Sequence, residues 1–171
     1  SRGRLAEPSR PALRWRHRRT GAGAGELGLA RYRTGRPRRT ASARRLKGET
    51  GVGARASTSY GEHVTTEIAA ELCGRGVGVI SGAAFGIDGA AHRAALLAGG
   101  TTIAVLAGGV DRPYPRAHAD LLDRIATLQA VISEVPCGSE PTKWRFLQRN
   151  RVIAALGDAT VVVEAGHGSG S

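Results

Sequence analysis

The stretch of sequence that decides the fold is Ser81-Gly-Ala-Ala-Phe-Gly-Ile-Asp-Gly-Ala-Ala-His92. The four residues before it, Val77-Gly-Val-Ile80, form a short apolar run with the β-branching of a buried strand. The alanine-rich run 87–98 that completes it has a helical period. The stretch is therefore predicted to be a strand-to-helix turn, where unpaired N–H groups and glycines suit a phosphate. The alternative is a tight turn of small residues that serves close packing alone.

Apolar strands alternate with helices along the rest of the chain. The predicted helices are 61–75, 87–98, 117–127 and 144–156, and the predicted strands are 77–80, 101–107, 130–133 and 160–164. Because each strand is apolar throughout, we expect a parallel sheet that is covered on both faces. Right-handed crossovers then give an α/β, doubly wound sheet.

Four polar or glycine-rich segments follow the predicted strands, at 81–86, 108–114, 133–134 and 164–171. In an open parallel sheet, ligands bind beyond the carboxyl ends of the strands. Since all four segments converge there, a ligand site at the turn 81–86 is favoured over a turn that only packs.

The basic charge of the chain is confined to its first fifty residues. Residues 1–50 hold 15 Lys and Arg against 3 Asp and Glu, a net charge of +12, whereas residues 51–171 carry a net charge of −1. Residues 1–50 also lack Val, Ile, Phe and Cys, so we expect disorder there. This segment is either a basic arm that binds nucleic acid or a non-native stretch translated in the wrong frame. The expected organisation is a low-complexity segment, 1–50, and a domain, 51–171.

A glycine pattern precedes the first predicted helix. Gly51-Val-Gly-Ala-Arg-Ala56 loosely matches the dinucleotide pattern G-x-G-x-x-A, which requires a strand immediately before it. The preceding residues, Arg44–Thr50, are too polar for a buried strand, so the dinucleotide interpretation is not favoured. Arg55, beside Ser57 and Thr58, remains a candidate phosphate ligand.

The start of the last predicted helix, Lys143-Trp-Arg-Phe-Leu-Gln-Arg-Asn-Arg151, is rich in cations and aromatic rings. Cations suit phosphates and rings suit unpaired bases, so the cluster indicates single-stranded nucleic acid. The alternative is a solvated basic face with Phe146 or Trp144 in the core.

Other polar residues carry weaker signals. Asp88 and His92 are spaced for a metal or acid–base pair, but an acid at a helix start with a pairing histidine is favoured. Cys73 and Cys137 are expected to be two unpaired thiols. No metal, cofactor or catalytic residue is expected. With no run of 18 apolar residues and no secretory signal, we expect a cytoplasmic protein without a membrane partner.

Taken together, these motifs resemble the DNA-processing protein A family, also called Smf or DprA. The similar segments are Ser81–His92, Gly99–Asp111, Tyr114-Pro115, Ser133-Glu134, Phe146 with Arg149–Ile153, and Val162–Ala165 with Ser169–Ser171. The resemblance implies a Rossmann-like domain that binds single-stranded DNA, acts in natural transformation and loads the RecA recombinase. It also implies a homodimer and no required catalysis.

By position, the resemblance assigns eight residues to a DNA- and phosphate-binding site: Arg55, Ser81, Gly82, Gly86, Lys143, Phe146, Arg149 and Arg151. The family has an apolar strand before Gly53 that Gly48–Val52 does not match, and it continues beyond Ser171. We therefore expect a sheet that is incomplete at both ends. A nucleotide phosphoribohydrolase is the alternative enzyme, but its Pro-Gly-Gly-x-Gly-Thr motif is absent.

Overall fold

The computed structural model describes residues 48–52 and 57–165. These residues form one five-stranded sheet in the order β4-β3-β2-β1-β5, and every neighbouring pair of strands is parallel. The strands are β1 (Gly48–Val52), β2 (Gly78–Ser81), β3 (Thr102–Leu106), β4 (Ala130–Ser133) and β5 (Ala159–Val162). The predicted parallel α/β sheet is confirmed.

Four α-helices connect the strands: α1 (Ser59–Gly74), α2 (Ile87–Leu97), α3 (Ala119–Leu128) and α4 (Lys143–Leu156). A short 3₁₀ turn, Arg116–His118, leads into α3 where the sequence predicted the start of one continuous helix. Each helix matches its predicted counterpart to within two residues at either end, because the apolar periodicity and the flanking glycines mark these boundaries.

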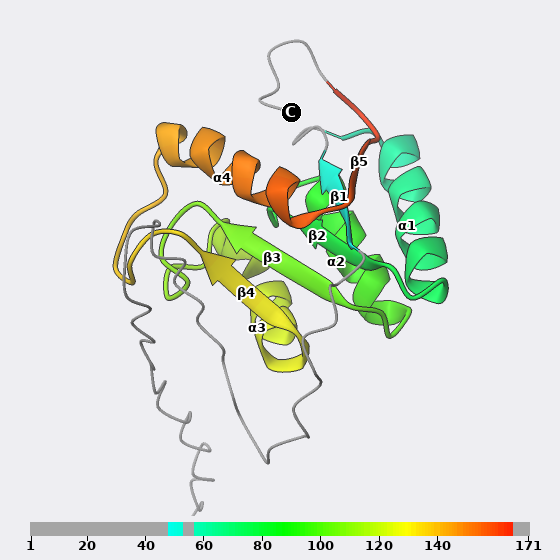
Figure 1. Ribbon diagram of the computed structural model, residues 1–171, viewed down its shortest axis with the longest axis horizontal. Helices are drawn as coiled ribbons and strands as arrows, with labels where there is room; N and C mark the ends of the chain where they lie inside the picture. Colours follow the sequence, from blue (N-terminus) through cyan, green and yellow to red (C-terminus); the bar gives the residue numbers. More distant parts are fainter. Residues whose placement is uncertain (1–47, 53–56, 166–171) are drawn as a thin grey trace, which may run out of the picture.

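The sheet buries both faces. Along each strand, side chains alternate between the faces, so adjacent Val79 and Ile80 enter different clusters. Val79 packs with alanines of α1 and α2, and Leu106 packs with α3. Ile80 packs on the other face with Val152 and Ile153 of α4. Helices therefore cover both faces, with α4 opposite the other three (Figure 1), as a doubly wound sheet requires.

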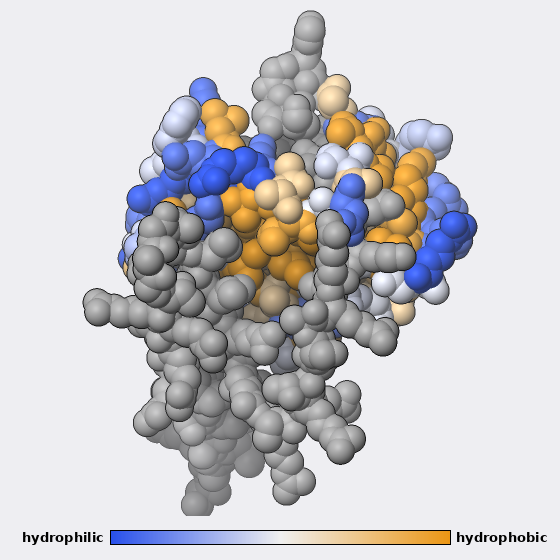
Figure 2. Space-filling view, viewed as in Figure 1, coloured by the Kyte–Doolittle hydropathy of each residue, from blue (hydrophilic) through white to orange (hydrophobic). Residues whose placement is uncertain are grey.

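The face that carries α4 is mixed in polarity. Figure 2 shows hydrophilic residues over α4 and hydrophobic residues gathered beside it, near the centre of this face. In the sheet layer under α4, Ile103 and Ala130 are only partly buried. The helix packs one side on the sheet, whereas its exposed surface is mixed in polarity and includes Trp144, Leu147 and Leu156.

One prediction about the sheet is wrong. The segment before Gly53 was expected to be too polar for a buried strand, but Gly48–Val52 forms β1 between β2 and β5. Gly48 is buried, and a Cβ atom there would lie only 2.9 Å from Cδ1 of Ile80. Hydrogen bonding to a strand on each side, and a close approach that glycine permits, place this polar segment in the sheet.

The existence of β1 also changes the argument about the glycine pattern 51–56. A strand does precede Gly53, so the reason for setting the dinucleotide pattern aside no longer holds. However, Gly51 lies within β1 itself, and residues 53–56 lie outside the described residues. The pattern therefore carries no assignment.

Candidate nucleic-acid interface

The carboxyl ends of β2, β3 and β4 meet the amino-terminal end of α4 at one edge of the sheet. The loops that follow β3 and β4 and the first turn of α4 come together on the left of Figure 1. The loop after β2 reaches the same edge, since Gly82 bonds to Arg149 of α4. Three of the four segments predicted to converge, 81–86, 108–114 and 133–134, do so, while most of the fourth, 164–171, lies outside the described residues. We call this region the carboxyl edge.

The interior of the carboxyl edge is held by Arg149. This side chain is only 7% exposed, and its Nη1 donates hydrogen bonds of 2.7 Å to the carbonyl oxygens of Gly82 and Val105. A Cβ atom on Gly82 would lie 2.0 Å from Nη1, so only glycine leaves room for the guanidinium. Arg149 therefore ties the ends of β2 and β3 to α4.

Asp88 provides the counter-charge in this interior. It lies in the first turn of α2, is 6% exposed, and accepts a 3.2 Å hydrogen bond from the backbone N–H of Ala84. Burial raises the pKa of this carboxyl group, while Arg149 and bonds from the turn after β2 oppose the rise. The turn 81–86 is thus fixed from beneath by a buried charge on each side.

His92 is fully buried one turn farther along α2. Its Nδ1 lies 2.7 Å from the hydroxyl oxygen of Thr102, and that hydroxyl donates to the carbonyl oxygen of Val79. Because the Thr102 proton is committed to Val79, Nδ1 of His92 carries the proton and donates. Burial, with His118 and Arg149 nearby, lowers the pKa of His92 to about 3, so the ring is neutral at pH 7.

The predicted pairing of Asp88 with His92 is wrong. Asp88 bonds to the turn and faces Arg149, whereas His92 bonds to Thr102. Their four-residue spacing places them on one helix face, but the two side chains serve different neighbours. Asp88 does lie in the first turn of α2, as expected for an acid at a helix start.

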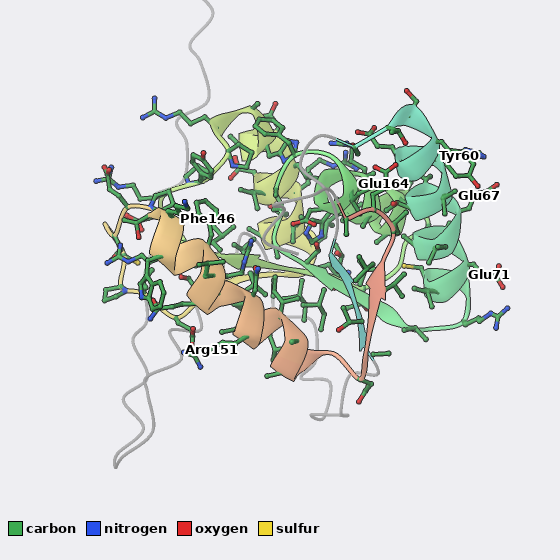
Figure 3. All side chains as sticks on the ribbon, turned by 90° about the horizontal axis from the view of Figure 1, so that it is seen from above. Tyr60, Glu67, Glu71, Phe146, Arg151 and Glu164 are labelled. Atoms are coloured by element: carbon green, nitrogen blue, oxygen red, sulfur yellow. The ribbon has the colours of Figure 1, made fainter. Side chains whose placement is uncertain are left out.

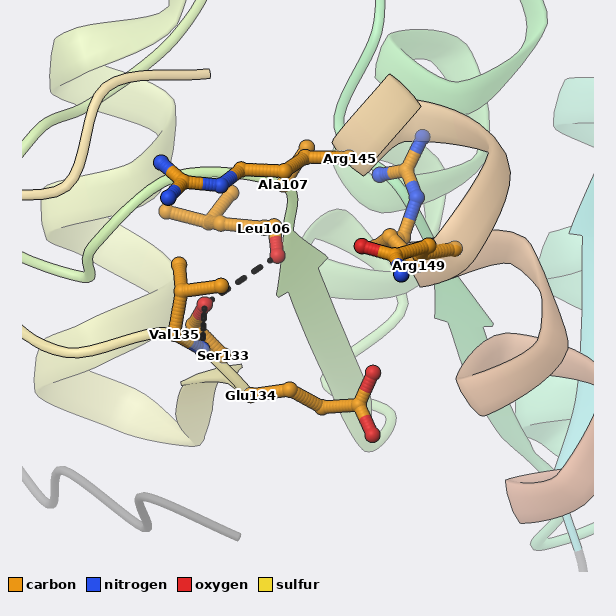
Figure 4. A pocket seen from close by; sticks show the side chains of 8 residues that line it. Leu106, Ala107, Ser133, Glu134, Val135, Arg145 and Arg149 are labelled. Carbon is orange, nitrogen blue, oxygen red and sulfur yellow. Dashed lines mark hydrogen bonds between the residues drawn. The ribbon is translucent and has the colours of Figure 1, made fainter. Parts of the chain in front are cut away.

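A shallow pocket opens between β3, β4 and α4 (Figure 4). Its floor is fixed by Ser133, whose hydroxyl donates to the carbonyl oxygens of Gly108 at 2.7 Å and Leu106 at 3.3 Å. The same hydroxyl accepts from the backbone N–H of Val135. Ser133 is buried and its bonding capacity is used, so it joins the β3 and β4 loops rather than facing a ligand.

The outer surface of the carboxyl edge carries different groups. Thr142 caps α4 by accepting a 3.3 Å hydrogen bond from the N–H of Arg145, and Lys143, the first residue of the helix, is exposed. No ion pair of Lys143 is formed with any residue that the structure describes. A solvent-facing ammonium at this edge is available to a phosphate.

Phe146 lies one turn after Lys143 and is half-buried. Its ring centroid is 5.5 Å from that of Tyr114, which is 47% exposed on the loop after β3, and 5.8 Å from the guanidinium carbon of Arg149. Trp144, by contrast, is 66% exposed. Neither ring of the cluster lies in the core, and the Phe146–Tyr114 pair presents aromatic surface beside Lys143.

Arg151 belongs to another side of α4. Figure 3 shows Phe146 and Arg151 on different sides of the helix, as a spacing of five residues requires. The Arg151 guanidinium donates at 2.8 Å to Oε1 of Glu134, which follows β4. Arg151 therefore faces the end of β4, away from the Lys143–Phe146 surface.

The eight predicted site residues thus separate into distinct environments. Lys143 and Phe146 meet at the outer surface, while Ser81, Gly82 and Arg149 are buried beneath the turn. Gly86 caps α2 at φ +73° and ψ −125°, a backbone conformation that favours glycine. Arg55 lies outside the described residues. The assignment of all eight to DNA contact remains a prediction. Lys143, Phe146 and Gly86 suit it best because they reach the surface, whereas Arg151, which also reaches the surface, is paired with Glu134.

Sequence reasoning missed Tyr114 and Phe85 as aromatic groups of this edge. In the sequence analysis Tyr114 belongs only to a family motif, and Phe85 only to the turn 81–86. Both are about half exposed, and both follow the carboxyl end of a strand. Their position in strand-terminal loops was the available signal, since loops at this edge carry ligand contacts.

Carboxylates accept hydrogen bonds from the residues at the start of α1. Thr58, its N-cap, donates from its backbone N–H to Glu164 at 3.0 Å and from its hydroxyl at 2.5 Å, while Ser57 donates to Glu62 at 2.7 Å. Figure 3 shows Glu164 beside the start of α1. Ser57 and Thr58 follow the candidate phosphate ligand Arg55 in the sequence, and both of their hydroxyls donate to acidic side chains.

The part of the chain that the structure describes has neither a metal-binding cluster nor a membrane-spanning helix. It holds no group of three or more His, Cys, Asp and Glu side chains that could bind a metal ion. No helix there is long and apolar enough to cross a membrane. Cys73 and Cys137 are both unpaired, as predicted.

Comparison with known proteins gives consistent matches. The family model described as DNA recombination-mediator protein A matches residues 40–171. A DprA relative of Mycobacterium tuberculosis is 58% identical over 120 residues, which is 70% of this chain and 31% of the relative. The DNA processing protein DprA of Bacillus subtilis is 42% identical over 120 residues, 70% of this chain and 40% of the relative. The chain thus spans about a third of the length of these relatives.

Solved structures agree with the sequence matches. DNA processing protein A from Streptococcus pneumoniae superposes with a TM-score of 0.71 and 40% identity, covering 74% of this chain and 44% of that one. DNA processing protein A from Helicobacter pylori, described in a structure of its single-stranded DNA binding mode, has a TM-score of 0.69 and 31% identity. It covers 73% of this chain and 57% of that one.

Proposed function

The chain belongs to the DNA recombination-mediator protein A family, and from that premise we propose that its carboxyl edge binds single-stranded DNA. The observation that carries the proposal is the outer surface formed by Lys143, Phe146 and Tyr114. It combines an exposed cation with no ion pair among the described residues and an accessible aromatic pair. Cations track the phosphates of a single strand, and rings stack on its bases without strong sequence preference.

The proposal extends to the role of the whole protein. We propose a recombination mediator in natural transformation that protects incoming single-stranded DNA, loads the RecA recombinase, forms a homodimer and works in the cytoplasm. Family membership supports this role, as does the Helicobacter pylori relative, whose structure concerns single-stranded DNA binding. In this proposal, the described domain supplies the surface that holds the strand.

We also propose that binding requires no catalysis. The phosphoribohydrolase alternative is not favoured, because the sequence lacks its Pro-Gly-Gly-x-Gly-Thr motif and the family and relatives are DNA-processing proteins. The buried Asp88 and His92 are committed to Ala84 and Thr102, which gives them structural rather than chemical roles.

Fluorescence anisotropy with a labelled oligo-dT strand tests the proposal. Lys143→Ala and Phe146→Ala should each weaken binding about 5- to 10-fold, because each removes a phosphate or stacking contact, with no change in the thermal midpoint. Tyr60→Ala is the matched control, since Tyr60 is an exposed aromatic residue on the acidic outer side of α1 (Figure 3). It should bind as the unmodified chain does.

The basic segment 1–50 requires its own control, because it can bind nucleic acid without the folded site. The variants are therefore compared in the full chain and in a chain that lacks residues 1–47. If Lys143→Ala and Phe146→Ala bind normally, or if binding disappears only when the basic segment is removed, the proposed site is rejected. Arg55→Ala is measured alongside them, because Arg55 remains a predicted phosphate ligand.

A further inference from the structure

A second exposed aromatic residue lies on the carboxyl edge, in the turn after β2. Phe85 is 49% exposed, and its ring centroid lies 5.0 Å from that of His118 at an interplanar angle of 62°. His118 is buried, and its Nδ1 donates a 3.0 Å hydrogen bond to the carbonyl oxygen of Ala83. The histidine therefore braces one edge of the Phe85 ring while about half of the residue remains open to solvent.

Two arginines lie near His118, one in space and one along the chain. If Gly89 carried a Cβ atom, it would lie 2.7 Å from Cε1 of His118 and 3.2 Å from Nη1 of Arg93, so both groups gather at the first turn of α2. Arg116 is exposed two residues before His118. Neither arginine forms an ion pair with a residue in the described ranges. His118, the ring neighbour of Phe85, is thus close to Arg93 in space and to Arg116 along the chain.

One short segment connects the two aromatic groups. Tyr114 at its start contacts Phe146, and His118 at its end contacts Phe85. Four residue steps span at most about 14 Å of extended chain, so the two groups lie within a few nucleotides of each other on a single strand. They are also connected through the turn 81–86, which Arg149 holds against α4.

We propose that a single DNA strand bound at Lys143 and Phe146 continues past the turn to Phe85, which forms a second base-stacking position. In this arrangement Arg93 and Arg116 pair with backbone phosphates on either side of the stacked base. The inference rests on the proposed function, since it extends the same site toward α2. It predicts that the affinity depends on strand length and that Phe85 matters only for strands long enough to reach it.

Binding of short and long oligo-dT strands, of about 2 and about 20 nucleotides, to the full chain tests this path, because the short strand cannot reach both aromatic groups at once. Phe85→Ala should weaken binding of the long strand about tenfold and leave the short strand unaffected, because one stacking contact is lost. Phe85→Trp, which keeps an aromatic ring, should bind the long strand as tightly as the unmodified chain does. A merely structural role of the side chain would not require this result. Since Phe85 is half exposed, the thermal midpoint of Phe85→Ala should stay unchanged.

Abasic strands locate the contact. A single abasic site is moved along the long strand, and one position should weaken binding to the unmodified chain but not to Phe85→Ala, because the same stack is already lost. Arg93→Ala and Arg116→Ala should each reduce the salt dependence of binding, with a slope change of about 0.7. Leu97→Ala, which truncates an exposed side chain at the far end of α2, is the control and should change neither quantity.

The outcomes separate this inference from the proposed function. If Lys143→Ala weakens binding while Phe85→Ala matches the unmodified chain at both lengths, the second stacking position is rejected and the proposed site stands. If Phe85→Ala weakens both lengths equally, the path from Phe146 to Phe85 is rejected. If neither Lys143→Ala nor Phe85→Ala changes binding, both proposals are rejected.

Discussion

The inner and outer sides of the carboxyl edge come from the same short stretches of sequence but differ in what their polar groups contact. On the inner side, Arg149, Asp88 and His92 are buried and bonded to strand ends, the turn and Thr102. On the outer side, Lys143 is exposed and the Phe146–Tyr114 pair reaches solvent. The inner groups hold the loops in place, and the outer groups remain available to a ligand.

This difference shows why the basic cluster of α4 cannot be treated as one surface. Lys143, Arg149 and Arg151 lie within nine residues, yet one faces solvent, one is buried in the edge and one pairs with Glu134. The predictions below separate loss of stability, expected on the inner side, from loss of binding, expected on the outer side.

The largest effect on stability is expected for Arg149→Met. Methionine has an apolar side chain of similar length. The change leaves the carbonyl oxygens of Gly82 and Val105 without a donor, and it removes the positive charge near the buried Asp88. Removing a buried arginine that donates to two buried carbonyl oxygens and interacts with a buried carboxyl group costs about 3–5 kcal/mol of unfolding free energy, measured by denaturant titration.

Arg151→Met serves as the matched control for this change. Its exposed ion pair with Glu134 is worth less than about 1 kcal/mol, so the protein should remain nearly as stable. Equal losses for the two variants would contradict the assignment of Arg149 to the inner side. Adding Asp88→Asn to Arg149→Met should recover part of the loss, since the uncompensated carboxylate is then removed.

A smaller loss is expected for Gly82→Ala. The new methyl group would meet the guanidinium of Arg149 at 2.0 Å and displace it from its carbonyl partners. Overpacking of this kind costs about 1–3 kcal/mol, measured as the shift in the denaturation midpoint. Gly74→Ala is the control, because nothing lies within 4 Å of that position. If the two alanine variants are equally stable, Arg149 is not confined as described.

The dependence of stability on pH provides the third and smallest effect. His92 is neutral in the folded protein because its pKa is lowered to about 3, whereas in the unfolded chain the imidazole has its ordinary pKa of 6.5. The unfolded state therefore binds more protons between these values, and the unfolding free energy falls as the pH decreases below 6.5. The expected slope is at most about 1.4 kcal/mol per pH unit.

His92→Asn isolates this contribution, since the amide can still donate to Thr102 but does not titrate. Denaturant titrations from pH 7 down to about pH 5 should show a shallower slope in the variant. Asp88 changes the stability in the opposite direction, because burial raises its pKa. Since both proteins contain Asp88, the unfolding free energy of the variant is compared with that of the unmodified chain at each pH. Equal slopes in the two proteins would show that the pKa of His92 is the same in the folded protein as in the unfolded chain.

Much of the fold could be predicted from the sequence, because buried apolar side chains recur with the period of the helix or strand that carries them. Fully apolar strands at 77–80 and 130–133 and the helices between them follow from side-chain spacing alone. The strand β1 could not be predicted this way. Its residues, Gly48-Glu-Thr-Gly-Val52, lack an apolar run, and their place between β2 and β5 depends on backbone pairing with strands distant in the sequence.

The chemistry of the site was only partly predictable. The cations and rings of α4 indicate nucleic acid, but composition does not separate an inner arginine from an outer one. Helical phase offered a signal, because Arg149 shares a face with Val152 and Ile153, which pack on the sheet. The Phe85 and Tyr114 rings depended on contacts made across loops, which no local pattern specifies.

The most direct test of the division between the two sides is the affinity of the Lys143→Ala, Phe146→Ala double variant for oligo-dT, measured by anisotropy with its thermal midpoint recorded in parallel. We predict that the dissociation constant rises at least about 30-fold, because a phosphate contact and a stacking ring are lost together, while the midpoint stays unchanged. A dissociation constant within about twofold of the unmodified chain would contradict the account, since two such contacts cannot be lost at so small a cost.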